Sequence, residues 1–277
     1  MQEFRFNLPR YAFSARNAAR AGDIWRGFQE VATSASEAVG WPPSRYQADN
    51  VGFVVRSMTT VHHRETAHGE ALIGQTWVRE FRRGMMITRE IQFRGEAGPL
   101  ASTVQEWVHV RTNLHGEDGD QPPLRVARAS SVLVNSFTTV PGTLGVTLPE
   151  FAPLPGPMGG FEFDCWQTWT DPLGHVNHPV YLDWCDESVA RGLRKLHIDP
   201  DLLVPVAEQV HWKLPVLPGD RVSVQSEKLG TTASGAVVFA HSVRKQGDLL
   251  CATATTVRTL ATGPERLLGI WRGSVVE

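Results

Sequence analysis

Residues 171–191 read Asp-Pro-Leu-Gly-His-Val-Asn-His-Pro-Val-Tyr-Leu-Asp-Trp-Cys-Asp-Glu-Ser-Val-Ala-Arg, a polar loop that leads directly into a helix. Asn177 is a good N-cap residue, because its side-chain oxygen can accept a hydrogen bond from a free N–H of the first turn. Pro179 suits that first turn, where its missing N–H costs nothing. Apolar side chains then recur at helical spacing and predict a buried stripe of Tyr181, Trp184, Cys185, Val189 and Leu193.

The loop before this helix carries one acid, Asp171, and one imidazole, His175. An acid and a histidine ahead of a helix suit acyl chemistry, because N–H groups of the first turn can hold a carbonyl oxygen while the acid attacks or activates water. Asp171 is therefore the first candidate for catalysis, and both roles, general base and nucleophile, stay open. The competing interpretation is a turn aspartate beside a structural histidine, since Asp is common in turns.

The motif Asp-x-x-Gly-His-Val-Asn-x-x-x-Tyr-Leu at residues 171–182 resembles the helix entry of hotdog-fold acyl thioesterases. Its His-Val-Asn run at 175–177, followed by Tyr181, is most similar to the acyl-ACP thioesterases of plants and bacteria. Asp171, Gly174 and Tyr181 also match the 4-hydroxybenzoyl-CoA thioesterase branch more loosely. The resemblance implies a hotdog fold and hydrolysis of an acyl thioester, with no metal and no organic cofactor.

The resemblance carries over Asp171 and His175 as the catalytic pair. The positions that would hold or orient the thioester carbonyl are Gly174, Val176 and Asn177. Of these, Asn177 is more readily explained as a helix cap than as a catalytic group. Two further candidates lie on the helix, the acid Asp186 and the phenol of Tyr181, although Tyr181 also fits a core position.

Two departures from the acyl-ACP thioesterase pattern limit what can be transferred. Leu173 stands where the plant enzymes have an Asn, and residues 211–218 (His-Trp-Lys-Leu-Pro-Val-Leu-Pro) lack the Glu and Cys of a later strand. The catalytic network of those enzymes therefore cannot be transferred whole. His211 is one replacement for the missing polar partner, but a histidine on a strand is more often structural.

The elements expected around the motif occur twice. A helix is predicted over residues 23–39, with Asp23 as its cap and a buried stripe that includes Ile24 and Phe28. Runs rich in β-branched residues predict strands at 52–64, 69–81, 84–95, 101–112 and 124–137. After residue 160 the order returns, with a strand at 161–170, the loop and helix at 171–195, and strands at 205–215, 219–229, 234–245 and 248–261. A long helix followed by antiparallel strands is an α+β pattern.

The two halves can be aligned with each other. Gly69-Glu70 matches Gly219-Asp220 at an offset of 150 residues, and the helices match at 156, which places Trp25 on Tyr181. Together with the resemblance, this repeat implies a tandem (double) hotdog fold whose two domains pair as separate chains do in single-hotdog proteins. At the helix offset, the counterparts of Asp171, His175 and Asn177 are Ala15, Ala19 and Ala21. We therefore expect one active site, on the second half and near the seam, with the first half closing the acyl pocket.

The repeat also sets the expected domain boundaries. Residues 1–136 would form an N-terminal hotdog domain without the catalytic loop, and residues 161–277 a C-terminal hotdog domain with the active site. Residues 137–160 are rich in Pro and Gly and almost uncharged, which predicts an extended linker. Residues 113–122 read as a polar, mobile loop.

Bulk properties restrict the class of protein. The chain has 277 residues, 42% of them apolar, with a net charge of −2 that argues against a dedicated nucleic-acid binder. Three cysteines without metal spacing suggest a reducing compartment, and the absence of a signal peptide and of a long apolar run favours the cytoplasm and no membrane partner. No serine-hydrolase elbow, phosphate loop or metal motif occurs. The expected partners are acyl carrier protein or coenzyme A thioesters, with the chain acting as a monomeric pseudo-dimer or a homodimer.

Two other functions compete with thioester hydrolysis. Hotdog hydratases carry Asp and His in an Asp-x-Asn-Pro-x-His pattern, five residues apart, whereas Asp171 and His175 are four apart, and the His-Phe-Pro pattern of dehydratases is absent. A non-catalytic acyl-binding protein would also fit Leu173 and the missing strand residues.

Overall fold

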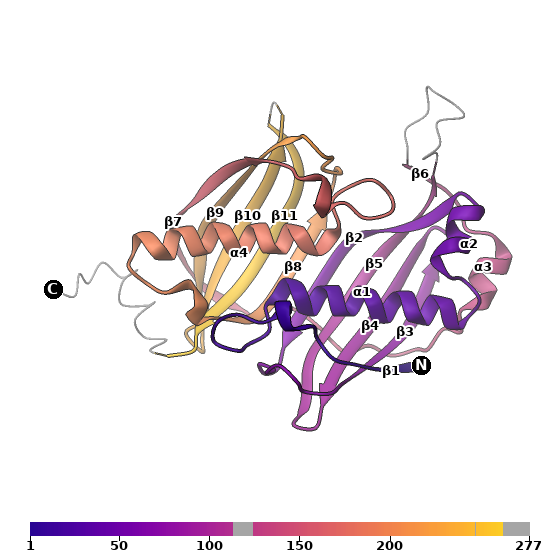
Figure 1. The fold of residues 1–277 in the computed structure, drawn as a ribbon, viewed down its shortest axis with the longest axis horizontal. Coiled ribbons are helices and arrows are strands. Elements are labelled where there is room, and N and C mark those ends of the chain that lie inside the picture. Colours follow the sequence, from indigo (N-terminus) through magenta and orange to yellow (C-terminus); the bar gives the residue numbers. More distant parts are fainter. Residues whose placement is uncertain (113–123, 247, 263–277) are drawn as a thin grey trace.

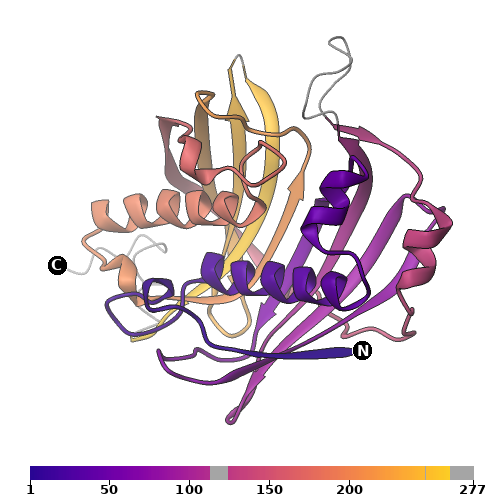
Figure 2. The same cartoon turned by 45° about the vertical axis from the view of Figure 1, so that its right-hand side comes forward.

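The computed structural model describes residues 1–112, 124–246 and 248–262 (Figure 1). The eleven strands of these residues form one antiparallel sheet, and two long helices lie on the same face of it (Figure 2). The polar loop expected at 113–122 lies outside the described residues.

The first half of the chain contributes one long helix and the strands on one side of the sheet. Its elements are β1 (Gln2–Phe6), α1 (Ala21–Ala38), α2 (Pro43–Ala48), β2 (Val51–His62), β3 (Leu72–Arg82), β4 (Met86–Gly95), β5 (Gly98–Thr112), β6 (Leu124–Val126) and α3 (Ser131–Ser136). The second half repeats the plan with β7 (Phe151–Asp164), α4 (His178–Lys195), β8 (Leu203–Trp212), β9 (Arg221–Thr232), β10 (Val237–Lys245) and β11 (Leu249–Leu260). Short 3₁₀ turns precede α1, α4 and β8 at Arg10–Ala12, Gln167–Trp169 and Pro200–Leu202.

The strand order makes the two halves equivalent. The sheet runs β1-β3-β4-β5-β2-β8-β11-β10-β9-β7, with β6 beside β5. Reading outward from the centre, β2 corresponds to β8, β5 to β11, β4 to β10, β3 to β9 and β1 to β7. The halves meet where β2 pairs antiparallel with β8, from Ser57 opposite His211 to Val61 opposite Ala207. We call this β2–β8 boundary the seam.

The helical stripes predicted from the sequence form the core between helices and sheet. In α1, Ile24 and Phe28 are almost fully buried, and in α4 the five predicted residues from Tyr181 to Leu193 are all buried. Trp25 of α1 approaches Trp212 of β8, with ring centroids 6.2 Å apart, so the core continues across the seam. Burial of such large apolar side chains is the main favourable term in folding.

Three predictions of local structure are wrong. Helix α1 begins at Ala21 with Arg20 as its N-cap residue, so Asp23 lies inside the first turn and does not cap it. The strand predicted at 124–137 is only the three residues of β6, after which α3 forms. Strand β7 begins at Phe151, so residues 151–160 of the predicted linker belong to the sheet.

The remaining part of the connecting segment crosses the face of the sheet opposite the helices. The N–H of Val140 donates to Val78 O of β3 at 2.9 Å, and the N–H of Leu144 donates to the buried carboxylate of Glu90 at 2.6 Å. Leu148 then packs against buried residues of the second half. The segment is thus fixed to both halves rather than hanging free between them.

Candidate active site

The loop before α4 is held by a tight pattern of backbone hydrogen bonds. The N–H of Asp171 donates to His175 O at 2.9 Å, and the N–H of Gly174 donates to Asp171 O at 3.0 Å. Gly174 has a φ of +79°, a left-handed conformation that favours glycine, and nothing lies within 4 Å of where its Cβ would stand. The turn therefore presents its outer side to open space.

Asp171 and His175 face each other inside this loop. The Asp171 Oδ2 and His175 Nδ1 atoms are 3.6 Å apart, and the two side chains are 14% and 16% exposed. The other oxygen of Asp171, Oδ1, accepts the Leu173 N–H at 2.8 Å. Burial raises the pKa of Asp171, while the charge of His175 and the Leu173 N–H oppose that rise. The carboxylate is thus more basic than an exposed one, and its Oδ2 accepts no hydrogen bond from the described residues.

The contacts of His175 fix where one of its protons sits. Its Nδ1 lies 3.2 Å from Val176 O, which can only accept, so Nδ1 carries a proton. In the neutral ring Nε2 is then an acceptor, and only the protonated ring presents a second N–H there. His175 can therefore polarise a carbonyl through Nε2 only in its charged form.

The backbone N–H groups of Gly174, Val176 and Asn177 are all occupied. That of Gly174 donates to Asp171, that of Val176 donates to Val216 O, and that of Asn177 donates to Trp169 O. In the described part of the loop, the N–H of His175 is the one that makes no such contact. The free N–H of this turn is thus on His175, not on the three residues that the sequence suggested.

Asn177 occupies the N-cap position of α4, but its side chain does not cap the helix, so that prediction is wrong. Its Oδ1 is buried without a hydrogen-bond partner among the described residues, and so is Nε2 of the next residue, His178. Burial, with smaller contributions from His175 and Arg26, lowers the pKa of His178 to about 3, so this ring is neutral. Sequence reasoning overlooked His178, because a histidine in a first turn carries no pattern of its own.

The loop lies at the seam and touches both halves. The ring of His178 packs edge-to-face on Trp107 of β5 and on Trp212 of β8, with centroids 5.8 and 5.7 Å apart. Leu173 faces Gly52 of β2, where an added Cβ would come within 3.6 Å of its side chain. The residue that departs from the family pattern is therefore a packing contact with the first half.

The two other helix candidates have structural partners. The buried Tyr181 oxygen accepts the Val216 N–H at 3.0 Å, which ties α4 to the β8–β9 connection. Asp186 Oδ1 accepts two hydrogen bonds from the buried Arg258, at 2.9 and 3.0 Å. His211 is exposed on β8. Among the candidates from the sequence, Asp171 and His175 are therefore the two neighbouring side chains that keep atoms free of hydrogen bonds to the described residues.

The first half has a loop of the same backbone shape without these side chains. The N–H of Ser14 donates to Ala18 O, and that of Asn17 donates to Ser14 O, both at 2.9 Å. These bonds repeat those of Asp171 and Gly174 at an offset of 157 residues, one more than the sequence alignment gave. The counterparts of Asp171, His175 and Asn177 are therefore Ser14, Ala18 and Arg20 rather than Ala15, Ala19 and Ala21. The first-half loop still has neither acid nor imidazole.

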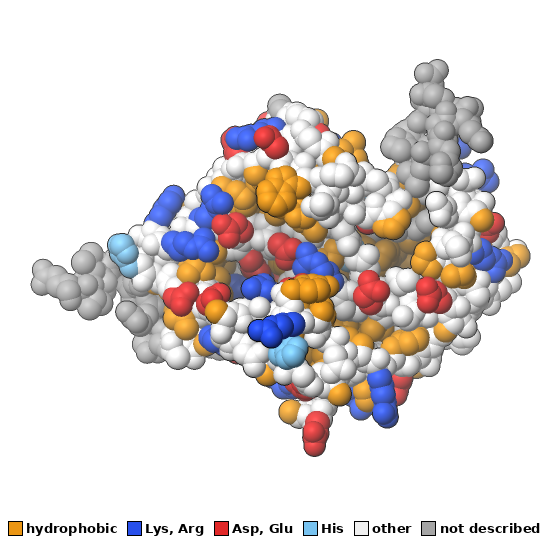
Figure 3. Space-filling model, in the orientation of Figure 1, with side chains coloured by type: hydrophobic (Ala, Val, Ile, Leu, Met, Phe, Trp, Pro, Cys, Tyr) orange, Lys and Arg blue, Asp and Glu red, His pale blue; other side chains and the backbone are white. Residues whose placement is uncertain are grey.

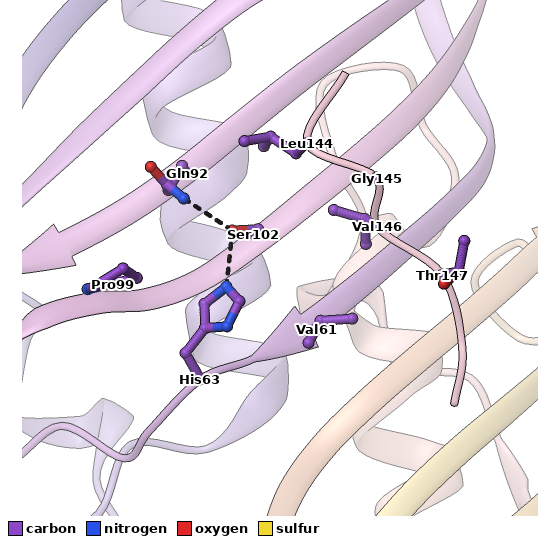
Figure 4. A pocket seen from close by; sticks show the side chains of 9 residues that line it. All are labelled: Val61, His63, Gln92, Pro99, Ser102, Leu144, Gly145, Val146 and Thr147. Carbon is purple, nitrogen blue, oxygen red and sulfur yellow. Dashed lines mark hydrogen bonds between the residues drawn. The ribbon is translucent and has the colours of Figure 1, made fainter. Parts of the chain in front are cut away.

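A separate hollow of about 320 Å³ lies between the sheet and residues 144–147 of the connecting segment (Figure 4). Ser102 Oγ is 2.9 Å from His63 Nε2 and accepts from Gln92 Nε2 at 3.2 Å. Ser102 is only 3% exposed, and no carboxylate is among the described residues that line the hollow. This pocket therefore lacks an accessible acid or nucleophile.

The described residues contain neither a metal-binding cluster nor a membrane-spanning helix. Within residues 1–112, 124–246 and 248–262, no three His, Cys, Asp or Glu side chains gather as metal ligands would. Over the same residues, no helix combines the length and apolar character needed to cross a bilayer.

The second half of the chain matches a known family by sequence. Residues 165–262, which include the loop and α4, match the model of the thioesterase-like superfamily. No curated protein matches the chain.

Solved structures match the chain over nearly its whole length. A protein assigned as an oleoyl thioesterase in Lactobacillus plantarum is 17% identical, with a TM-score of 0.74 and coverage of 93% of this chain and 95% of that one. A 12:0-ACP thioesterase from Umbellularia californica is 12% identical, with a TM-score of 0.73 and 94% of each chain covered. An acyl-ACP thioesterase from Bacteroides thetaiotaomicron is 13% identical, with a TM-score of 0.68 and coverage of 93% and 97%. These likenesses establish the hotdog fold, and with the family match they confirm the resemblance seen at 171–182.

Proposed function

We propose that this chain, whose residues 165–262 match the thioesterase-like superfamily, hydrolyses acyl thioesters with Asp171 and His175. The observation that carries the proposal is the 3.6 Å approach of these two side chains in the loop that opens α4. One acid with a free oxygen, beside an imidazole and a turn that faces open space, provides the groups that hydrolysis of a thioester needs.

In the simpler route Asp171 acts as a general base. Its Oδ2 takes a proton from water, the resulting hydroxide attacks the thioester carbon, and the C–S bond breaks to release a carboxylic acid and a thiol. In the alternative route Oδ2 attacks the carbon directly and the C–S bond breaks, which forms an acyl–Asp171 anhydride and releases a thiolate that takes a proton from solvent. Water then hydrolyses the anhydride to the carboxylic acid and regenerates Asp171. The raised pKa of Asp171 favours either role, since it makes the carboxylate a stronger base.

The negative oxygen that develops on the thioester carbonyl needs a donor. We assign this role to the backbone N–H of His175, which none of the described loop contacts uses. The protonated imidazole of His175 is a second donor through Nε2. Gly174 supports this arrangement, because the turn it permits has no side chain over its outer side.

The two-fold plan of the sheet supports a double hotdog in one chain. We assign residues 1–136 to an N-terminal hotdog domain and the residues after 160 to a C-terminal one, with β7 extending the second domain back to Phe151. The first domain would close the acyl pocket against the loop at the seam. The substrates are acyl-ACP or acyl-CoA, and the molecule acts as a pseudo-dimer, alone or as a homodimer in the cytoplasm.

A non-catalytic acyl-binding protein is the second candidate. It is favoured by Leu173, which fills the place of a polar residue with a packing contact against the first half. A hydratase is disfavoured by the four-residue spacing of Asp171 and His175.

The test is hydrolysis of acyl-ACP and acyl-CoA panels of increasing chain length, by wild type, Asp171→Asn and His175→Ala. We expect either variant to lose about 100-fold or more in kcat with its fold intact, as for groups in general acid–base chemistry. His211→Gln serves as the matched control, because His211 is exposed on β8 and should leave kcat unchanged. An acyl mass found on the Asp171 peptide after rapid quenching would identify the anhydride route.

Wild type that binds acyl thioesters but turns them over no faster than Asp171→Asn would contradict hydrolysis and support the acyl-binding role. Hydration of an unsaturated acyl thioester without release of thiol would instead favour the hydratase.

A further inference from the structure

The loop that leads into α1 holds a hollow of its own, of about 520 Å³. Its walls are formed by Arg10, Phe13, Ser14, Ala15, Asn17 and His68. Figure 3 shows basic and histidine side chains next to one another over this part of the surface. The hollow is of the size that ligand sites have in proteins.

This hollow stands where the repeat places the counterpart of the candidate active site. Ser14 corresponds to Asp171 at the offset of 157 residues, within a loop of the same hydrogen-bond pattern. A hydroxyl thus replaces a carboxylate, which removes the negative charge from this position. Ser14 Oγ is buried and has no hydrogen-bond partner among the described residues.

The polar groups around the hollow are mostly donors. Arg10 forms no ion pair with any carboxylate that the structure describes. The acids nearby are already neutralised, because Glu65 pairs with Arg16 and Glu70 pairs with Arg64. Asn17 Oδ1 accepts the His68 N–H at 3.3 Å, which leaves the amide NH₂ of Asn17 as a donor. No acid lines the hollow among the described residues.

We propose that this hollow binds a phosphate group, held by the Arg10 guanidinium, the Ser14 hydroxyl and the ring of His68. A guanidinium beside a hydroxyl and an imidazole matches an anion with several acceptor oxygens, and charge-assisted hydrogen bonds are the stronger ones. Coenzyme A carries such a group, so the proposal rests on the proposed function for this source of phosphate. Free inorganic phosphate is the other source of the same chemistry.

The test is equilibrium binding by calorimetry to the full chain with Asp171→Asn, which prevents turnover. The probes are coenzyme A, dephospho-coenzyme A, which lacks the 3′-phosphate, and inorganic phosphate. We expect Arg10→Gln to weaken binding of a phosphate probe by about tenfold, the value of one charge-assisted hydrogen bond. Ser14→Asp, which restores the acid of the second-half loop, should abolish that binding. Arg5→Gln is the matched control, since Arg5 is exposed on β1 and its loss changes net charge equally.

Arg10-dependent binding of coenzyme A that is lost with dephospho-coenzyme A supports the site and names the 3′-phosphate as its ligand. Arg10-dependent binding of inorganic phosphate alone supports the site with a free anion. Equal affinities for every probe in wild type, Arg10→Gln and Arg5→Gln would overturn the proposal.

Failure of this proposal can be told apart from failure of thioester hydrolysis. Acyl-N-acetylcysteamine carries no phosphate, so its turnover tests the reaction alone and should be unchanged in Arg10→Gln. Loss of turnover with that substrate in wild type would refute the reaction, while the calorimetric result for phosphate would stand by itself.

Discussion

Asp171 lies between two opposing influences on its charge. Burial favours its protonated form, while the imidazole of His175 favours the carboxylate. Since both proposed routes need the carboxylate, the pH dependence of activity would report the balance between burial and the imidazole.

We predict that kcat/KM falls as the pH is lowered, with a midpoint above the usual aspartate value of about 4. In His175→Gln the midpoint should move further up, because the opposing influence of the imidazole is removed. Carbon NMR of labelled aspartate would follow the same titration without relying on residual activity. A midpoint that stays in place in His175→Gln, as it should in His211→Gln, would rule out this coupling.

The proximity of Asp171 and His175 could be predicted from the sequence, because the two residues lie four positions apart in one loop, where local geometry decides the distance. The surroundings of Asn177 and His178 could not be predicted in this way, because the contacts of a side chain in the first helical turn depend on partners from distant strands. The rings of Trp107 and Trp212 enclose His178 from two different halves of the chain. No local pattern could have placed them there.

At the scale of elements, α1 contacts α4 at Gly22. A Cβ on Gly22 would overlap Asp183 Oδ1, and Asp183 in turn forms an ion pair with Arg26 of α1. Glycine at this point of α1 therefore serves the contact between the helices, against its own helix propensity.

We predict that Gly22→Ala lowers the free energy of unfolding by about 1–2 kcal/mol, because the new methyl displaces Asp183 from Arg26. In an Asp183→Ala background the same change should become stabilising, since alanine is the better helix former. Urea unfolding of the four proteins in this cycle measures the coupling. If Gly22→Ala changed the free energy of unfolding equally in both backgrounds, the contact between Gly22 and Asp183 would not contribute to stability.

Two of the three wrong predictions of local structure, α3 and β7, have physical explanations. The run after β6 looks like a strand by its β-branched residues, but Ser130 accepts the Leu133 N–H at 3.2 Å and starts α3. The prolines of residues 151–160 suggested a linker, yet β7 is the outermost strand, paired only with β9, where missing N–H groups are tolerated. Its register shifts occur at Pro153 and Pro157.

The whole molecule is joined at the seam by buried charges as well as by strands. His62 of β2 lies 2.7 Å from Glu208 of β8, and Arg258 of β11 binds both Glu208 and Asp186 of α4. Burial alone would raise the pKa of Glu208, but His62 and Arg258 outweigh it and hold that pKa below its usual value. Glu208 therefore stabilises the fold above its unfolded pKa of about 4, and this contribution is lost as the pH falls further.

We predict that Arg258→Met lowers the free energy of unfolding by about 3–5 kcal/mol, because it removes the buried guanidinium from the fully buried carboxylate of Glu208 and from the partly buried Asp186. Arg221→Met removes two ion pairs that are exposed at the surface, with Glu162 and Asp164, and should cost less than about 1 kcal/mol. Chemical denaturation of both variants provides the comparison. Similar losses in the two proteins would mean that the buried network adds nothing specific to the seam.

The overall fold was more predictable than its details. The helical stripes and the α+β repeat depend on periodicity, which sequence displays directly. The single sheet across the seam depends on β2 meeting β8, residues 57–61 with 207–211, and only the folded chain specifies such a register.

The prolines of β7 have a consequence for how copies of this molecule meet in a crowded solution. Pro153, Pro155 and Pro157 supply no N–H, so an incoming strand from another molecule cannot complete a ladder on that border. Strand addition is therefore disfavoured along this part of the β7 edge. The opposite edge of the sheet, at β1, is where we expect growth into a fibre to begin. Aggregation of the concentrated protein would therefore involve the β1 edge.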